Sequence, residues 1–422
     1  KCCNLKEIRL PKNLTYIGDH SFLGALNLDK IIGGDLVTYI GNSAFYKTKW
    51  LKNQGDFVAI GKTLYRYKGD SRSVLLPSDI THIASYAFAD TQIERVKAIG
   101  GVSLGEGVFY RCGNLRDVFI GMDNIPPFCF YGCEQLNTSF SVETVGKFGL
   151  YNCRSLEKIR AKRIGVCALT FSTKLKGVFG VEELRDGALF SCKNIEELAI
   201  KGVDTIGRFA LARTGLKSVR FAGNFIDDFA FYQAYNLCNV NIYHTVQVGE
   251  AILLGCESVR TMTISGKYKL MSYFGGKMPK VTSLYVHGDV TDDFCRNNPY
   301  LQKLQILHAE KFGGWSFYNN SALTSVTLTD VNTIGCWAFA YCDYIKSITL
   351  PKTVVFIGMN AFRYCHNLNV IVLQSSKCVL FGTNAFYSTA ENKSFRVKNG
   401  LKAKYHEEPI WREYDYLIEE GI

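Results

Sequence analysis

Apolar residues return along this chain in a fixed order, with polar residues between them. The phrase I-G-x-x-A-F occurs at residues 40–45, 334–339 and 357–362. The Phe that ends the phrase marks a site that recurs about every 21 residues between Phe88 and Phe386. A unit this short cannot bury its own apolar side and must stack on its neighbours, so the pattern predicts a solenoid.

We call the last residue of this phrase the Phe position. It stays apolar through the whole chain, which predicts that its role is burial in a continuous core. It is filled by Phe22, Phe45, Phe88, Phe109, Phe130, Leu150, Leu169, Leu189, Leu211, Phe231, Leu253, Tyr273, Cys295, Phe317, Phe339, Phe362 and Phe386. The long interval between Phe45 and Phe88 indicates an insertion.

A second apolar run, L-x-x-I-x-L, is clear at residues 115–120 and 323–328. Its last residues alternate between apolar and polar, which predicts a short β-strand with one buried face. The Gly of the first phrase, as at Gly335 and Gly358, fits either a positive φ or a close approach between coils. The segment x-x-A-F-x-x-C is too short for a long helix and predicts one turn of 3₁₀ or α-helix.

The full phrase I-G-x-x-A-F-x-x-C-x-x-L-x-x-I-x-L-P resembles the BspA-like leucine-rich repeats of bacterial and protozoal cell-surface proteins. The resemblance covers nearly the whole chain, is tightest at residues 334–373 and is loosest at 262–310. It implies an α/β solenoid, a single curved rod of about 17 coils with short parallel strands and short 3₁₀ or α turns. It also implies a secreted, extracellular or cell-surface protein that acts in recognition or adhesion, and it supplies no catalytic residue.

The repeats divide the chain into a solenoid at residues 1–392 and a C-terminal capping segment at 393–422, where Trp411, Tyr414 and Tyr416 supply apolar cover. The chain starts inside a repeat, which predicts a mature or trimmed fragment whose signal or anchor lies elsewhere. Residues 50–82 interrupt the period and read as a hairpin around Gly61. We expect this hairpin to be a surface addition that widens one coil and is dispensable for folding. The alternative is that it forms a loop that contacts a ligand.

The sequence offers no constellation for catalysis, a cofactor or a metal. It has neither H-E-x-x-H nor G-x-S-x-G, and Asp56 stands where a phosphate-binding loop ending at Gly61-Lys62-Thr63 needs Gly. We therefore predict that the chain is not an enzyme. The net charge is +11, but no run of five Lys or Arg exists, which disfavours nucleic acid. No apolar run is long enough for a membrane span.

Cysteine is unusually frequent, with 15 residues in the chain. One group shares a register three residues beyond the Phe position: Cys2, Cys112, Cys133, Cys153, Cys192, Cys256, Cys342 and Cys365. Small residues such as Ala25 and Ser172 fill the same register elsewhere, so we predict a column of buried thiols. Disulfides between rungs are disfavoured, because rungs about 4.8 Å apart exceed the Cβ separation of a disulfide.

Strand alternation predicts which residues face outward, namely those two and four beyond the leading Leu. From residue 95 to 220 these columns carry cations and aromatics, and from 239 to 349 they are mostly Ser, Thr and Asn. The predicted partner-binding residues are Arg95, Lys97, Phe119, Phe140, Lys158, Arg160, Phe179 and Arg220. Clustered outward aromatics beside Arg are typical of protein interfaces, whereas the competing interpretation is that the Phe side chains pack on one another. We expect a monomer that binds a protein partner; carbohydrate is the alternative ligand class.

Overall fold

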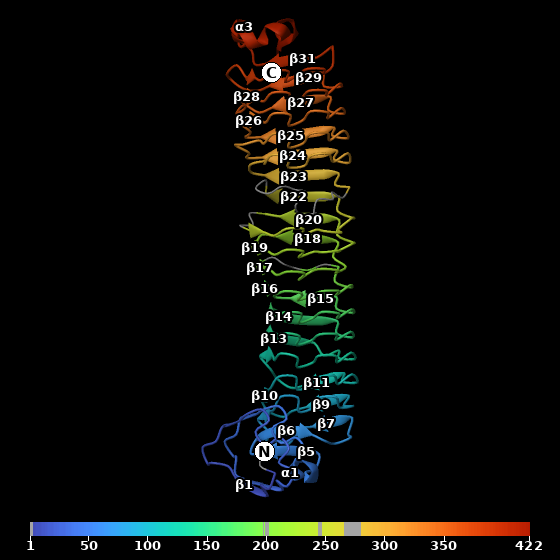
Figure 1. Ribbon diagram of the computed structural model, residues 1–422. Coiled ribbons are helices and arrows are strands. Elements are labelled where there is room, and N and C mark those ends of the chain that lie inside the picture. The colour runs from blue at the N-terminus through green and yellow to red at the C-terminus, as the bar shows by residue number, and fades with distance from the viewer. Residues whose placement is uncertain (1–2, 197, 199–201, 244–246, 266–279) are drawn as a thin grey trace. The chain divides into compact units, whose positions relative to one another are not determined.

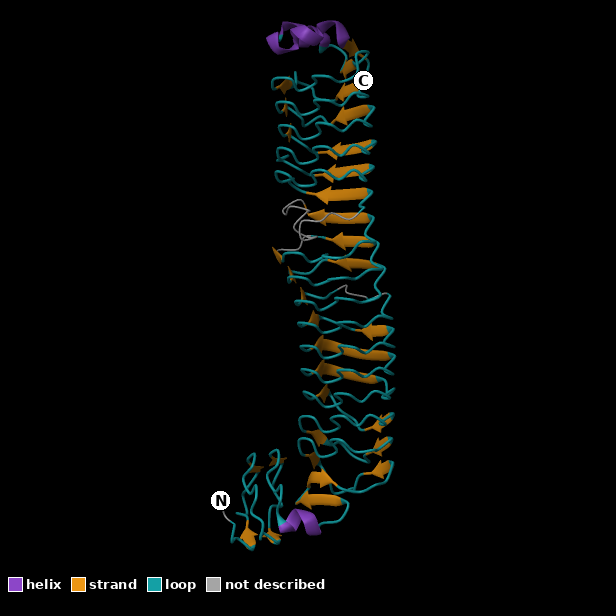
Figure 2. Cartoon of the chain, turned by 45° about the vertical axis from the view of Figure 1, so that its right-hand side comes forward, coloured by secondary structure: helices purple, strands orange, loops and turns teal. Residues whose placement is uncertain are grey.

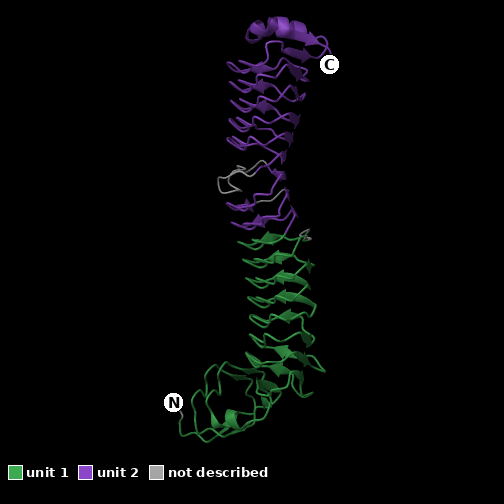
Figure 3. Cartoon of the chain, turned by 90° about the vertical axis from the view of Figure 1, so that its right-hand side faces the viewer, with its two compact units in different colours: residues 1–215 green, residues 216–422 purple. Residues whose placement is uncertain are grey.

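The computed structural model describes residues 3–196, 198, 202–243, 247–265 and 280–422. The chain divides into two compact units, residues 1–215 and 216–422, which Figure 3 distinguishes by colour. Each unit is a stack of coils, and the strands of one coil pair in parallel with those of the next (Figure 1). The predicted parallel solenoid is therefore confirmed.

Two lines of strands run along each unit (Figure 2). The L-x-x-I-x-L runs form the first line, and the residues just before the recurring Gly form the second. The first line contains β1 (Glu7–Arg9), β3 (Lys30–Ile32), β7 (Ser73–Leu75), β9 (Arg95–Lys97), β11 (Asp117–Phe119), β13 (Phe140–Val145), β14 (Lys158–Ile164), β15 (Gly177–Phe179), β18 (Ser218–Phe221), β20 (Asn239–Ile242), β22 (Thr261–Ser265), β23 (Ser283–His287), β24 (Lys303–Leu307), β25 (Ser325–Thr329), β27 (Ser347–Leu350) and β29 (Val370–Leu373). The second contains β2 (Tyr16–Ile17), β4 (Tyr39–Ile40), β8 (His82–Ile83), β10 (Ser103–Leu104), β12 (Asn124–Ile125), β16 (Glu183–Leu184), β17 (Thr205–Ile206), β19 (Phe225–Ile226), β21 (Gln247–Val248), β26 (Thr333–Ile334), β28 (Phe356–Ile357) and β30 (Leu380–Phe381). The long strands β13 and β14 belong to both lines, because their last residues pair with β12 and β16.

The Phe position lies inside the stack, as predicted. Phe109 stacks on Phe88 and on Phe130, with ring centroids 5.3 Å apart in both pairs. In the second unit Phe339 stacks on Phe362 at 5.4 Å. Burial is incomplete at the start of the column, where Phe22 in the first coil is only half-buried. Tyr273 lies outside the described residues. Burial of this column supplies the apolar core of each unit.

The segment around the Phe position forms turns rather than the expected helical turn. Trp337 and Tyr341, two residues before and after Phe339, have φ of 59° and 61°. The amide of Phe339 donates to the carbonyl of Ala361 in the next coil at 2.8 Å. A helical turn would use every such amide within its own coil. Here alternate amides join one coil to the next, and those between them stay within the coil, as where the amide of Ala340 donates to the carbonyl of Trp337 at 3.3 Å.

The recurring Gly is required by close approach between coils. A Cβ added at Gly358 would lie 2.5 Å from the backbone nitrogen of Cys336, and one at Gly105 would lie 2.7 Å from that of Ser85. Neither glycine has a positive φ. Of the two explanations drawn from the sequence, only steric proximity holds, and any side chain here would push the coils apart.

The cysteine column is buried, as predicted, and its thiols make hydrogen bonds that the sequence did not indicate. The Sγ of Cys112 donates to the carbonyl of Phe88 at 3.0 Å, and the Sγ of Cys133 donates to that of Phe109 at 3.1 Å. Each acceptor is the Phe position of the preceding coil. Burial raises the pKa of Cys192 to about 12, so its thiol is protonated at neutral pH. Cys2 lies outside the described residues.

The insertion contributes to the core, which corrects our expectation that it only decorates a coil. After α1 (Lys49–Asn53), the strands β5 (Phe57–Ile60) and β6 (Thr63–Tyr67) pair antiparallel around Gly61, whose φ is 55°. β6 then pairs in parallel with β8. Tyr67 is buried and its ring stacks on Phe88 at 5.0 Å. The hairpin therefore takes the place of a coil and continues the aromatic column.

The C-terminal segment contains β31 (Ser394–Val397), α3 (Lys402–Glu407), the 3₁₀ helix η1 (Pro409–Leu417) and β32 (Ile418–Glu420). Trp411 is fully buried, and its Nε1 donates to the carbonyl of Val379 at 2.8 Å. Its ring lies 4.8 Å from Phe381, in the last coil. Tyr414 is also buried, but Tyr416 is 83% exposed, so its expected part in the apolar cover is wrong.

Candidate functional site

In the first unit, β7, β9 and β11 present one apolar and basic column to solvent. Val96 and its neighbours in the ladder face the core, so strand alternation turns the flanking residues outward. The register pairs Leu75 with Lys97 and Lys97 with Phe119. Phe119 is 56% exposed, and Leu75 is similarly exposed. A lysine thus stands between two solvent-facing apolar side chains.

In the neighbouring column of outward residues, which contains Arg95 and Asp117, the positive charge is already partly neutralised. The Nε of Arg95 lies 3.0 Å from the Oδ2 of Asp117, its register partner on β11. Within the described ranges, Lys97 makes no ion pair. Of the two predicted cations on β9, Lys97 is therefore the one whose charge is open to a partner.

A second group of outward residues lies on β13, β14 and β15. Ser141 pairs with Arg160, and Arg160 pairs with Phe179. Phe179 is 44% exposed, and its ring bends back over Gly177, where a Cβ would lie 2.8 Å from the ring Cζ. Neither Lys158 nor Arg160 forms an ion pair with any residue that the structure describes. This group repeats the pairing of a solvent-facing aromatic ring with an open cation.

Phe140 does not belong to this surface. It is 7% exposed, pairs in register with the buried Ile159, and its ring lies 5.2 Å from that of Phe130. One extra residue separates Leu136 from the first inward residue of this strand. A one-residue shift turns every following side chain to the opposite face, so Phe140 packs inside and Ser141 points outward.

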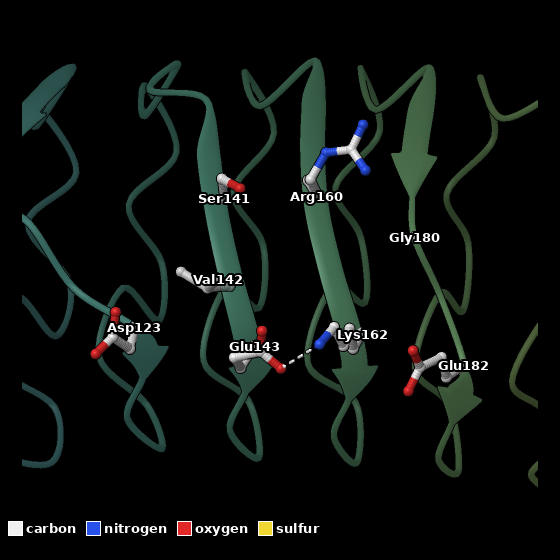
Figure 4. A pocket seen from close by; sticks show the side chains of 8 residues that line it. All are labelled: Asp123, Ser141, Val142, Glu143, Arg160, Lys162, Gly180 and Glu182. Atoms are coloured by element: carbon white, nitrogen blue, oxygen red, sulfur yellow. Dashed lines mark ion pairs between the residues drawn. The ribbon is translucent and has the colours of Figure 1, made fainter.

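A shallow pocket of about 300 Å³ opens beside Arg160 (Figure 4). It is lined by Asp123, Ser141, Val142, Glu143, Arg160, Lys162, Gly180 and Glu182. The Nζ of Lys162 lies 3.0 Å from the Oε2 of Glu143. Figure 4 shows Asp123 and Glu182 on either side of this pair, with Arg160 at one end. Charges of both signs within one pocket suit the polar groups of a peptide chain.

Arg220, the remaining predicted residue, lies in the second unit on β18. It pairs with Asn241 in register, and its guanidinium lies 5.7 Å from the centroid of the Tyr243 ring. We therefore define the strand-face site by residues of the first unit alone. These residues are Leu75, Lys97, Phe119, Lys158, Arg160 and Phe179.

Comparison with known families decides the class of the repeat. The sequence model described as "BspA type Leucine rich repeat region (6 copies)" matches residues 1–116, 102–179, 170–274 and 290–406. The chain belongs to the BspA-type leucine-rich repeat family. A comparison with curated proteins gave no match.

Several solved structures of bacterial proteins match this chain at low identity. This BspA-type chain is 20% identical to a leucine-rich repeat protein from Bacteroides ovatus, over 100% of this chain and 85% of that one, with a TM-score of 0.28. It is 15% identical to a leucine rich cell surface protein from Faecalibacterium prausnitzii, over 84% of this chain and 98% of that one, with a TM-score of 0.32. It is 15% identical to the pneumococcal vaccine antigen PcpA, over 99% and 87%, with a TM-score of 0.25.

Leu75 is the site residue that the sequence interpretation missed, because it lies within the insertion. The signal was present: residues 73–77 read S-V-L-L-P, which matches S-I-T-L-P at 347–351.

The structure also shows aromatic rings on the turns, one residue after the Phe position. Tyr131 stacks on Tyr110 at 4.9 Å and on Tyr151 at 4.7 Å. These rings are half-buried and stack face to face on one another, so they stabilise the turns of the BspA-type coils.

Neither a metal site nor a membrane-spanning helix is found in the part of the chain that is described. There, no cluster of three His, Cys, Asp or Glu side chains is arranged to hold a metal ion. No helix in the same residues has the length and apolar character to cross a bilayer.

Proposed function

We propose that this BspA-type chain is a recognition or adhesion module that binds a protein partner through the strand-face site. The observation that carries the proposal is the pairing of exposed aromatic rings with open cations on adjacent strands. Phe119 lies beside Lys97, and Phe179 lies beside Arg160. Aromatic residues and Arg dominate the binding energy of protein interfaces, and a parallel ladder holds them without reorganisation.

The competing interpretation is that the three predicted outward rings, Phe119, Phe140 and Phe179, pack on one another, but Phe140 packs on Phe130 in the core instead. In the described part of the chain, neither Phe119 nor Phe179 has a ring within stacking distance. Each therefore keeps apolar surface that a partner could remove from water, at about 25 cal/mol per Å². Lys97, Lys158 and Arg160 flank this surface and would attract an acidic partner.

Membership in the BspA-type family supports an extracellular or cell-surface location for this module. A partner would then be a host, matrix or other surface protein. Solenoids present long rows of neighbouring strands, which suit contact with an extended partner surface.

The test is binding to a panel of purified matrix proteins immobilised on a sensor surface. Phe119→Ala with Phe179→Ala should weaken binding by about 2 kcal/mol, which is roughly thirtyfold in Kd. Phe356→Ala is the matched control, because Phe356 is 40% exposed but lies on β28 in the other line of strands. Equal losses in both variants, or no binding by the unaltered protein, would contradict the proposal.

A further inference from the structure

A separate pocket lies where the hairpin meets the preceding coil of the first unit. It has a volume of about 490 Å³. Its lining residues are Tyr46, Lys47, Thr48, Leu51, Lys52, Arg66 and Lys68. Four of these carry a positive charge and none carries a negative one. We call this the hairpin pocket; it shares no residue with the strand-face site.

Two of the cations are fixed by the main chain. The Nζ of Lys68 donates to the carbonyls of Leu51, Lys52 and Gln54 at 3.0, 3.0 and 2.7 Å, at the C-terminal end of α1. Nη1 of Arg66 donates to the carbonyl of Tyr86 at 2.9 Å. All three ammonium hydrogens of Lys68 are used by these carbonyls, so Lys68 contributes positive charge to the pocket but no further donor. The pocket therefore holds two pre-ordered positive groups.

The other two cations, Lys47 and Lys52, are exposed. Lys47 has a left-handed backbone, with φ of 65°, and its Nζ lies 5.7 Å from the centroid of the exposed Tyr46 ring. Neither Lys47 nor Lys52 makes an ion pair with a residue of the described ranges. The wall between them is rigid, because Thr48 is buried and its Oγ1 accepts the amide of Leu51 at 3.1 Å. Four positive charges thus converge on one pocket without an acidic partner.

The lining also restricts the ligand class. The ring of Tyr46, the side chain of Leu51 and the stems of the lysines give a carbon surface beneath the charged groups. A ligand that fits must offer a flat C–H face together with anionic groups on its edge. A pocket of this size is within the range of about 300–1,000 Å³ that small ligands occupy. A sugar ring that bears carboxylate or sulfate has both properties.

We infer that the hairpin pocket binds an anionic sugar unit of an acidic glycan, with the ring against Tyr46 and its acidic groups near Lys47, Lys52, Arg66 and Lys68. This is a function beyond the strand-face site. It also gives the insertion a role other than completing the core.

The test is isothermal titration calorimetry of the full chain with three probes at about 50 mM salt, where exposed charges are screened less than at physiological salt. The probes are a heparin-derived tetrasaccharide, neutral chitotetraose and tetraglutamate. The variant Lys47→Gln with Lys52→Gln leaves Arg66 and Lys68, with their structural bonds, in place. Tyr46→Ala removes the exposed ring. Lys62→Gln is the matched control, because Lys62 is an exposed lysine of the same hairpin outside the pocket.

We expect the heparin tetrasaccharide to bind the unaltered protein best, and the Lys47/Lys52 variant to lose about tenfold in affinity, since each exposed charge contributes a few-fold. Tyr46→Ala should also weaken binding, and Lys62→Gln should not. The Phe119/Phe179 variant should bind the tetrasaccharide normally, which separates this inference from the proposed protein interface. Equal binding by all lysine variants, no tetrasaccharide binding, or tighter binding of tetraglutamate would overturn the inference.

Discussion

Replacing Trp411 by Ala should uncover the last coil of the second unit. The Trp411 ring is fully buried and meets Phe381, Phe395 and Tyr405 edge to face, with centroids 4.8, 5.0 and 4.9 Å away. Truncating a buried Trp to Ala costs about 3–5 kcal/mol. The carbonyl of Val379 also loses the indole donor, which adds about 1 kcal/mol.

The expected loss is therefore about 5 kcal/mol in the free energy of unfolding of the C-terminal coils. For a unit of this size, that corresponds to a fall in Tm of roughly 10–20 °C. Trp411→Phe keeps most ring contacts and loses the indole hydrogen bond, so its loss should be about 1–2 kcal/mol. Tyr416→Ala is the matched control, because Tyr416 is an exposed aromatic residue of the same 3₁₀ helix.

Urea unfolding followed by far-UV circular dichroism measures these losses. Hydrogen exchange of the amides in β29 and β31 shows where they arise, because a solenoid can open from its end. If Trp411→Ala unfolds like Tyr416→Ala, with unchanged exchange in β31, the C-terminal segment does not stabilise the stack.

Three further changes test the core. Tyr67→Ala should lower the free energy of unfolding by about 3–5 kcal/mol, because the ring continues the aromatic column. A loss below about 1 kcal/mol would show that the hairpin does not contribute to the core. Gly358→Ala should lower the free energy of unfolding by about 1–3 kcal/mol. Gly113→Ala should lower it by less than about 1 kcal/mol, because a Cβ at Gly113 would meet open space. Burial raises the pKa of Cys192, Cys256 and Cys365 from near 9 to about 12. Folding therefore favours the protonated thiols. The free energy of unfolding should keep its full value below pH 9 and fall above pH 9, by up to about 1.4 kcal/mol per pH unit for each thiol. A free energy of unfolding that stays constant up to about pH 11 would contradict their burial.

The sequence predicted best where the coils keep a strict spacing. In the second unit, the outward columns were assigned from alternation alone, and the register confirms them: Asn241 pairs with Thr263, and Thr263 pairs with Tyr285. The Phe position and the cysteine column followed from the same period. These features depend on burial of one face, which the apolar pattern encodes directly.

The errors arise where something other than the pattern decides the structure. One extra residue before Phe140 reverses the alternation, and strand pairing with Ile159 reveals it. The turns around the Phe position use every second amide to join neighbouring coils, a long-range pairing that local spacing does not encode. The hairpin pocket joins Lys47 and Lys68 across the insertion, so it exists only after β6 is placed against the coil.

Contact between the strand-face site and a protein partner can be tested with a photo-crosslinking side chain at position 179. Benzoylphenylalanine would replace Phe179 in one sample and Phe356 in the other, since both phenylalanines are about equally exposed. After illumination with a matrix protein that binds the unaltered chain, mass spectrometry would identify the crosslinked residues. We expect an adduct from position 179 and none from position 356. An adduct from position 356 alone would contradict the assignment of binding to this face.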